Sequence, residues 1–309
     1  MLRGIAVAGV VALHTLDLRA GAAGVDLFFV ISGFIIGKVM VGRAPLSFLA
    51  DRFWRIFPLY WLCLLPWLGV AWATNQLDSG RVASSLILWP VFGGHFAPPY
   101  LKPAWSLCYE MLFYYSAAIA LATGKGRWLI AVFLGFFALN LIHPSALAGF
   151  LGYPLIIDFL LGLAVGRMKL DARVGSAALG LGAVLLVLAP ATYFVQHTLG
   201  VSDLSTVRRV LYWGVPSAMI VYGTLSLERF ATFSPLVVLG DASYAIYLTH
   251  MISIFFGGHG LSGLCVAIAV GLCAHFWIEK PLLRLRRHLS GRTFLAVIGW
   301  RWRRGRLAA

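Results

Sequence analysis

Residues 2–34, LRGIAVAGVVALHTLDLRAGAAGVDLFFVISGF, are the stretch that decides the fold of this chain. Gly21 and Gly24 lie between two apolar segments, which predicts two helices joined by a turn. Arg3 and His14 are eleven residues apart, about three helical turns, so we expect them on one helix face, roughly 16 Å apart along the axis. An ionisable side chain such as His14 inside an apolar helix indicates a functional site.

The rest of the chain has the same apolar character. Of its 309 residues, 61% are hydrophobic and 12% are charged, and the mean hydropathy is +0.87. The apolar runs recur at membrane-spanning length, which excludes a soluble globular domain. The formal net charge is +14, but the basic residues cluster between apolar runs, as in membrane proteins. We therefore expect an all-α, polytopic transmembrane helix bundle and no nucleic-acid partner.

About ten membrane helices are expected. Their ranges are 4–20, 23–42, 57–74, 104–123, 128–142, 151–167, 175–196, 208–227, 234–256 and 261–278. The run 84–94 is too short to span a bilayer and is interpreted as an interfacial or re-entrant piece. Residues 1–288 form the predicted transmembrane domain, and 289–309 form a basic cytoplasmic tail that lies against membrane lipid.

The distribution of basic residues predicts that both termini are cytoplasmic. With the N-terminus inside, most lysines and arginines lie on the cytoplasmic side, as the positive-inside rule requires. The exceptions are Arg19, Arg81, Lys102, Arg208 and Arg209. The opposite orientation would invert this ratio, so N-in and C-in is the expected topology.

Three ionisable residues in apolar segments are candidates for catalysis. An imidazole such as that of His14 can accept a hydroxyl proton near neutral pH, although it could also simply join two helices by a hydrogen bond. Asp26, early in the second helix, could orient that imidazole or serve only as an acid favoured by the helix dipole. Glu110 is expected to face the bundle interior or a wet cavity, as a second acid–base group or a contact for a sugar hydroxyl.

A second set of residues could bind substrates. Arg52 and Arg55 are three residues apart on the expected cytoplasmic side, and guanidinium groups suit phosphates. Arg3 could join them, although basic residues are also usual at cytoplasmic loop ends.

A polar stripe runs along the helix expected at 234–256. Ser243, Tyr247 and His250 are spaced i, i+4 and i+7 and should face the bundle core. They are acceptor-side candidates, as is Asp158, and packing is the alternative role for the tyrosine. We expect no metal ligand set and no bound cofactor.

The chain resembles the acyltransferase-3 family of integral-membrane acyltransferases. The opening stretch carries the resemblance together with four segments in the family's order: RFWRIFPLYW (52–61), PAWSLCYEMLFYY (103–115), LGDASYAIYLTH (239–250) and IEKP (278–281). In the commoner family wording a polar residue follows the glutamate, whereas Met111 follows Glu110 here. The wording is most similar to the branch that acetylates bacterial exopolysaccharides.

The resemblance implies a bacterial inner-membrane O-acyltransferase with acyl-CoA, expected to be acetyl-CoA, as co-substrate. Its acceptor would be a hydroxyl of a surface polysaccharide or of a lipid-linked precursor. The resemblance implies that His14, Asp26 and Glu110 are catalytic and that Arg3, Arg52 and Arg55 bind the donor. A proton-coupled secondary transporter of a polar solute is the alternative, because intramembrane His, Asp and Glu also fit such a carrier. A non-enzymatic scaffold for polysaccharide assembly is a third possibility.

Overall fold

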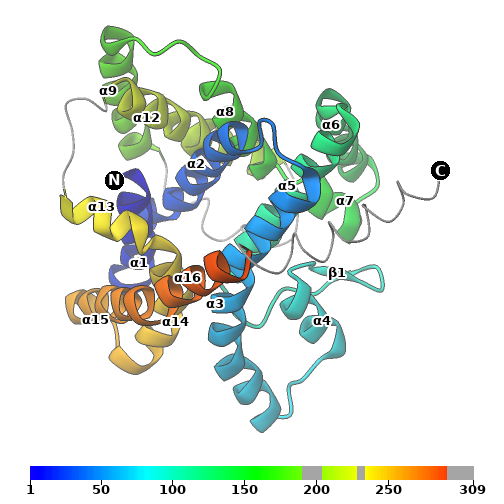
Figure 1. The fold of residues 1–309 in the computed structure, drawn as a ribbon, viewed down its shortest axis with the longest axis vertical. Coiled ribbons are helices and arrows are strands. Elements are labelled where there is room, and N and C mark those ends of the chain that lie inside the picture. The colour runs from blue at the N-terminus through cyan, green and yellow to red at the C-terminus, as the bar shows by residue number, and fades with distance from the viewer. Residues whose placement is uncertain (190–203, 228–233, 291–309) are drawn as a thin grey trace, which may run out of the picture.

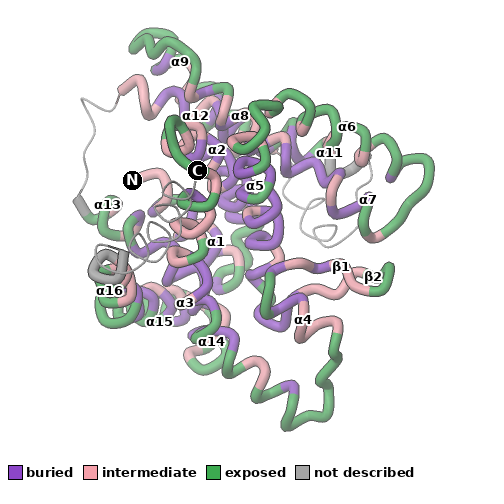
Figure 2. Tube along the Cα trace, turned by 45° about the vertical axis from the view of Figure 1, so that its right-hand side comes forward, coloured by how far each residue is buried: buried purple, intermediate pink, exposed green. Residues whose placement is uncertain are grey.

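Helices form nearly all of the structure, as the sequence predicts. The computed structural model describes residues 1–189, 204–227 and 234–290, and Figure 1 shows their arrangement. Buried residues are concentrated along α2, α5 and α8 in the middle of the molecule, whereas α6 and α9 at its periphery are mostly exposed (Figure 2). Many of the exposed side chains are large and apolar, which suits a surface in contact with lipid.

The first two helices cross closely at glycines. Helix α1 (Leu2–Leu16) and α2 (Ala23–Val39) are joined by a 3-10 turn, η1 (Arg19–Ala22). A Cβ atom on Gly21 would lie 2.0 Å from the carbonyl oxygen of Gly9. Only glycine permits such a close approach of two backbones, so these residues set the angle at which the helices meet.

Helix α3 (Pro45–Ala73) begins well before the expected range of 57–74. Pro45 stands at the first position of the helix, where proline's fixed φ is favourable. Pro58 lies inside the helix without ending it, which is tolerated in membrane helices. The expected start at residue 57 was therefore wrong, because the helix already includes the residues before it. As a result Arg52 and Arg55 lie within this long helix.

The segment after α3 contains no membrane-spanning helix, in agreement with the short interfacial or re-entrant piece expected there. Helix α4 (Ser79–Ile87) has nine residues. It is followed by an antiparallel hairpin of β1 (Val91–Phe92) and β2 (His95–Phe96), in which Val91 pairs with Phe96. The hairpin leads into α5 (Ala104–Thr123), which carries Glu110 into the middle of the bundle.

Helices α2 and α8 form the tightest contact of the core. A Cβ atom on Gly33 would lie 2.1 Å from the carbonyl oxygen of Phe159, and one on Gly162 would lie 2.0 Å from that of Val30. Small residues on both helices therefore allow the backbones to meet. The four helices between α5 and the first gap in the described residues are α6 (Gly126–Ile142), α7 (Ala146–Leu151), α8 (Leu155–Val165) and α9 (Ala172–Leu188).

Two π-helical turns interrupt the helices in the described part of the C-terminal half. The first, η2 (Val210–Gly214), lies between α11 (Leu204–Arg209) and α12 (Val215–Ser226). The second, η4 (His275–Glu279), follows α15 (Gly260–Ala274). Such turns are often found at functional sites, and each of these lies beside charged side chains that are described below. The chain continues into α16 (Lys280–Ser290), and most of the predicted tail, residues 291–309, lies outside the described residues.

The helix expected over 234–256 is two helices. Helix α13 (Ser234–Asp241) and α14 (Ser243–Gly257) are bent by 77° at Ala242. Ala242 is fully buried at the corner, and α13 packs across α1. The periodicity did not reveal this bend because both helices are apolar on either side of it.

The number of membrane spans is only partly settled by these helices. In the described residues, four helices are long and apolar enough to cross a membrane, and the bent α13–α14 pair makes five if it counts as one span. Helices α1, α6 and α9 are apolar but shorter. The expected count of ten and the N-in, C-in orientation stay predictions.

Candidate active site

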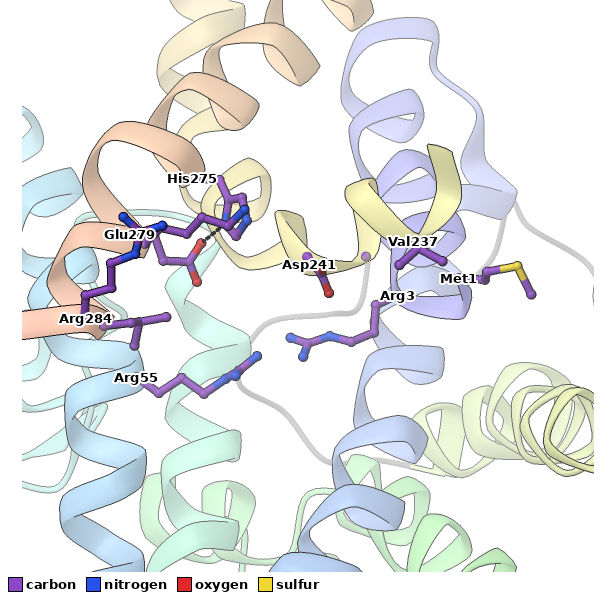
Figure 3. A pocket seen from close by; sticks show the side chains of 11 residues that line it. Met1, Arg3, Arg55, Val237, Asp241, His275, Glu279 and Arg284 are labelled. Carbon is purple, nitrogen blue, oxygen red and sulfur yellow. Dashed lines mark hydrogen bonds and ion pairs between the residues drawn. The ribbon is translucent and has the colours of Figure 1, made fainter. Parts of the chain in front are cut away.

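A cavity of about 560 Å³ lies at the Arg3 end of α1 (Figure 3). The guanidinium groups of Arg3 and Arg55 point toward one another across it. Helix α16 adds Lys280 and Arg284 to the lining, so the cations outnumber the acids, Asp241 and Glu279. The Glu279 carboxylate accepts a hydrogen bond of 2.7 Å from Nδ1 of His275. A cavity with this excess of positive charge suits a polyanionic ligand.

The bend between α13 and α14 contributes to this cavity. Asp241, at the end of α13, is exposed, and Figure 3 shows it beside Arg3. Because of the 77° bend, the two helices lie in different parts of the site. Helix α13 lines the cavity, whereas α14 continues into the bundle with its polar stripe.

A smaller cavity of about 50 Å³ adjoins the first, because Arg3 lines both. Its lining includes Glu110, Ser243 and Tyr247. The Glu110 carboxylate accepts a hydrogen bond from the Tyr114 hydroxyl, and Glu110 lies within electrostatic range of Arg3. Glu110 therefore faces a polar passage inside the bundle, the environment that the sequence predicts for it.

The predicted arginine pair divides between two environments. Arg55 lines the large cavity. The Arg52 guanidinium instead lies 5.7 Å from the ring centre of Phe48 and 5.8 Å from that of Tyr114. Among the described residues, Nε of Arg52 is buried without a hydrogen-bond partner. Arg52 therefore supports the Tyr114–Glu110 contact from the other side, and Arg55 faces the space where a ligand would bind.

His14 is exposed at the opposite end of α1. Its ring packs on that of His250 in α14, with ring centres 5.3 Å apart and planes inclined by 30°. Lys102 lies within electrostatic range of His14. Nδ1 of His259 contacts the His14 backbone oxygen at 3.2 Å, which fixes the end of the helix.

The polar stripe of α14 faces the core, as its spacing predicts. Ser243 and His250 are fully buried, and Tyr247 is 7% exposed. The Tyr247 hydroxyl lies 2.7 Å from Oγ of Ser106 and donates to the Pro103 carbonyl at 2.9 Å. Its ring centre lies 5.8 Å from that of His250. The stripe thus connects the small cavity, through Tyr247, to the histidine pair.

Asp26 is engaged with an arginine that sequence reasoning did not assign to it. Its two carboxylate oxygens accept from Nε and Nη2 of Arg209, at 3.0 and 2.7 Å. Both side chains are buried, and the Arg209 guanidinium also lies 4.9 Å from the ring centre of Trp213. The structure brings Asp26 to Arg209 and not to His14, so this geometry gives no support to an orienting role for Asp26.

Asp158 lies beside this ion pair rather than beside Glu110. It is fully buried and within electrostatic range of Asp26 and Arg209. A Cβ atom on Gly214, in the first π-helical turn, would lie 2.0 Å from Oδ1 of Asp158. Gly214 therefore makes room for this carboxyl group. Within the described residues, neither oxygen of Asp158 has a hydrogen-bond partner.

Arg209, Lys280 and Arg284 are the important residues that sequence reasoning missed. Arg209 was counted as an outer charge, and its burial depends on a partner 183 residues away. Lys280 and Arg284 are four residues apart in α16 and so share one helix face. That spacing, which begins at the lysine of the IEKP segment, was the available signal.

Comparisons with known proteins identify the family of this chain. A family model described as an acyltransferase domain matches residues 1–282. The exopolysaccharide production protein ExoZ of Rhizobium meliloti (strain 1021) is 32% identical, over 86% of this chain and 91% of the relative. The "Putative membrane-bound transacylase BcsY" of Komagataeibacter xylinus is 26% identical, over 90% of this chain and 81% of the relative. No solved structure matches the chain. Because the family model covers nearly all of the described residues, the protein belongs to the acyltransferase-3 family and is a membrane acyltransferase.

Proposed function

We propose that this acyltransferase moves an acetyl group from acetyl-CoA to a hydroxyl of a bacterial surface polysaccharide or of its lipid-linked precursor. The protein would be a multi-pass protein of the inner membrane. His14 would act as the general base. The names of its relatives support a glycan acceptor, since one is an exopolysaccharide production protein and the other is named as a transacylase.

One observation carries the proposal: polar groups follow one another from the cationic cavity to His14. Arg3 lines the large and the small cavity, Glu110 and Tyr247 line the small one, and the His250 ring packs against both Tyr247 and His14. Arg3 and His14 are roughly 16 Å apart along α1 by helix rise. A phosphate-rich donor bound at the Arg3 end could extend its pantetheine arm along this row.

The large cavity lined by Arg3, Arg55, Lys280 and Arg284 supports acetyl-CoA as the donor. Acyl-CoA presents a diphosphate and a ribose phosphate, and guanidinium groups bind such phosphates with charge-assisted hydrogen bonds. The small cavity beyond it, which Glu110 and Tyr247 line, has a volume of only about 50 Å³, and it ends short of His14. Passage of the thioester therefore requires the side chains around Glu110 and Tyr247 to move apart.

Direct transfer is the chemistry that we propose at His14. The imidazole takes the proton of the sugar hydroxyl while the hydroxyl oxygen attacks the thioester carbonyl. The C–S bond breaks, and the proton then passes from His14 to the leaving thiolate. In the alternative route, His14 is itself acylated. Incubation with labelled acetyl-CoA in the absence of acceptor distinguishes them, because only the second route leaves stoichiometric, His14-dependent label on the protein.

The proposal requires donor and acceptor to meet from opposite faces of the membrane. The Arg3 cavity would open to the cytoplasm, and the His14 end would face the acceptor. Reporter fusions within 75–81 should then report the outer side, and fusions near Lys125 should report the cytoplasm. A fusion that places Lys125 outside would contradict the orientation and the cytoplasmic donor site.

The decisive experiment is transfer of labelled acetate by purified protein to polysaccharide acceptor. His14→Ala should lower kcat by about 100-fold or more, the usual contribution of a general base. His143→Ala is the matched control, because His143 is an exposed histidine at the end of α6. A folded His14→Ala variant that transfers acetate at the wild-type rate would sink the assignment.

A further inference from the structure

We infer that His250 positions His14 for catalysis, by accepting a hydrogen bond from the His14 imidazole on its buried Nε2 atom. The inference rests on the proposed role of His14 as the base. It gives to His250 the orienting role for which the sequence suggested Asp26, whose two oxygens are occupied by Arg209.

The tautomer of His250 follows from its backbone contact. Its Nδ1 lies 2.6 Å from the carbonyl oxygen of Tyr247. A carbonyl oxygen only accepts hydrogen bonds, so Nδ1 must carry the proton and donate it. In the neutral imidazole the second nitrogen, Nε2, then has a free lone pair and is an acceptor.

That acceptor is buried and unused in the described part of the chain. His250 is fully buried, and Nε2 has no hydrogen-bond partner among the described residues. A buried acceptor without a hydrogen-bond partner is costly to the folded state. In the arrangement of the described residues, Nε2 accepts no hydrogen bond. We assign the His14 imidazole as the donor that uses this acceptor during the reaction.

The two rings are close enough for this contact. Their centres are 5.3 Å apart, which leaves room for a nitrogen-to-nitrogen contact of about 3 Å once the ring edges face each other. The torsion that rotates a histidine ring has a broad energy well, and the His14 side chain is exposed. His250 cannot turn in the same way, because Nδ1 is bound to its own helix.

Helix α14, which carries His250, is also hydrogen-bonded to the start of α5. The Tyr247 hydroxyl contacts both Ser106 and the Pro103 carbonyl, which ties α14 to the start of α5. These contacts of Tyr247 hold the part of α14 that carries His250 in place. A base that is held in one orientation by a fixed partner is the arrangement found in catalytic triads.

In the reaction, His250 would stay neutral while His14 carries the proton. As the hydroxyl proton moves to one nitrogen of His14, the N–H on the other nitrogen becomes a stronger donor. The lone pair of His250 Nε2 accepts this hydrogen bond and stabilises the imidazolium. When His14 returns the proton to the leaving thiolate, the contact weakens again, and no group other than His14 changes its charge.

Two substitutions of His250 separate this role from simple packing. The amide of His250→Asn can still donate to the Tyr247 carbonyl, but nothing remains at the position of Nε2. The longer amide of His250→Gln restores an acceptor near that position. We expect His250→Asn to lower kcat by about 100-fold, with KM for acetyl-CoA unchanged, and His250→Gln to retain more activity than His250→Asn. His143→Asn serves as the control.

The measured parameters also distinguish positioning from binding of the acceptor. A His250→Asn enzyme with wild-type kcat would overturn the inference. So would a raised KM for the polysaccharide with kcat unchanged, since that result would make His250 an acceptor contact. Thermal unfolding of both variants in detergent checks that each protein is folded.

A double variant tests whether His250 acts through His14. If it does, His14→Ala/His250→Asn should be no less active than His14→Ala alone, because residues that act as one unit are not additive. Multiplicative losses would overturn the inference. If His250→Asn does not fold, the same cycle is made with His250→Ala, which also removes the acceptor. An inactive His14→Ala beside a fully active His250→Asn contradicts only the pairing, whereas an active His14→Ala contradicts the proposed function itself.

Discussion

Two groups of charged and polar side chains lie inside this acyltransferase, and they differ in how they are satisfied. In the first, here called the ion-pair cluster, Asp26 and Arg209 share two hydrogen bonds in the buried core, with Asp158 beside them. In the second, here called the polar row, seven side chains line cavities or pack beside the ends of α1: Arg3, Arg55, Glu110, Ser243, Tyr247, His250 and His14.

The difference indicates which group is closed off inside the core and which group is open to a ligand. Asp26 is fully buried and its oxygens are both occupied, so neither is available to a substrate. In the polar row, His14 is exposed and Arg3 and Arg55 face open space. The ion pair with Arg209 accounts for the buried charge of Asp26, one of the residues that suggested a proton-coupled transporter.

The largest expected effect comes from breaking the ion-pair cluster. Arg209→Ala should lower the free energy of unfolding by about 3–5 kcal/mol, because it leaves buried carboxylates without a counter-charge. Asp26→Asn should cost a comparable amount by leaving the guanidinium unpaired. Thermal unfolding in detergent measures both. The double variant Asp26→Leu/Arg209→Met should recover much of the loss, and a stable, fully active Arg209→Ala protein would contradict the structural role of the cluster.

The next effect concerns the two arginines of α3. Arg55→Ala should raise KM for acetyl-CoA about tenfold or more, because a charge-assisted hydrogen bond contributes about 1.5–3 kcal/mol. Arg52→Ala should raise it less, since Arg52 packs on Phe48 and Tyr114. Steady-state kinetics with varied acetyl-CoA gives both values. Equal increases in the two variants would argue that the arginines bind the donor as a pair, as the sequence alone suggests.

A smaller effect is expected for helix α16. Lys280→Ala and Arg284→Ala should each raise KM for acetyl-CoA by about two- to fivefold, because partly exposed ionic contacts contribute at most about 1 kcal/mol. The increase should shrink at high ionic strength. Arg173→Ala is a suitable control, since Arg173 is an exposed basic residue at the start of α9. If neither α16 variant differs from this control, the donor contacts the cavity without α16.

The smallest effect should come from Asp158→Asn. Asparagine has nearly the same shape as aspartate, and the carboxyl group of Asp158 makes no hydrogen bond to the described residues. We expect a change in the free energy of unfolding within about 1 kcal/mol and unchanged kcat. A loss as large as that of Asp26→Asn would show that Asp158 is an equal member of the ion-pair cluster.

The order of residues along the chain was sufficient to predict much of the polar row. Arg3 and His14 share a helix, and so do Ser243, Tyr247 and His250, so helical spacing alone placed each set on one face. Arg55 and Glu110 were identified as charges in apolar segments, where function is the usual reason for a charge. Each of these inferences depends on the pattern within a single helix.

The bend between α13 and α14 shows where such reasoning fails. The run from 234 to 256 is apolar enough to predict one helix, but Ala242 is buried at a 77° corner. The corner exists because α13 packs across α1, and a single-segment pattern contains no information about a neighbouring helix.

By itself, the sequence determined the all-α membrane class, the faces of α1 and α14 and the candidate base, because hydrophobic length and helical period are local properties. Only the tertiary structure decided that Asp26 pairs with Arg209, 183 residues away, and that His250 is the ring beside His14. Several partners of suitable charge were available to Asp26 along the chain. The partner that Asp26 obtains depends on which helices pack together. Close glycine contacts determine that packing, for example between α1 and α2 and between α2 and α8.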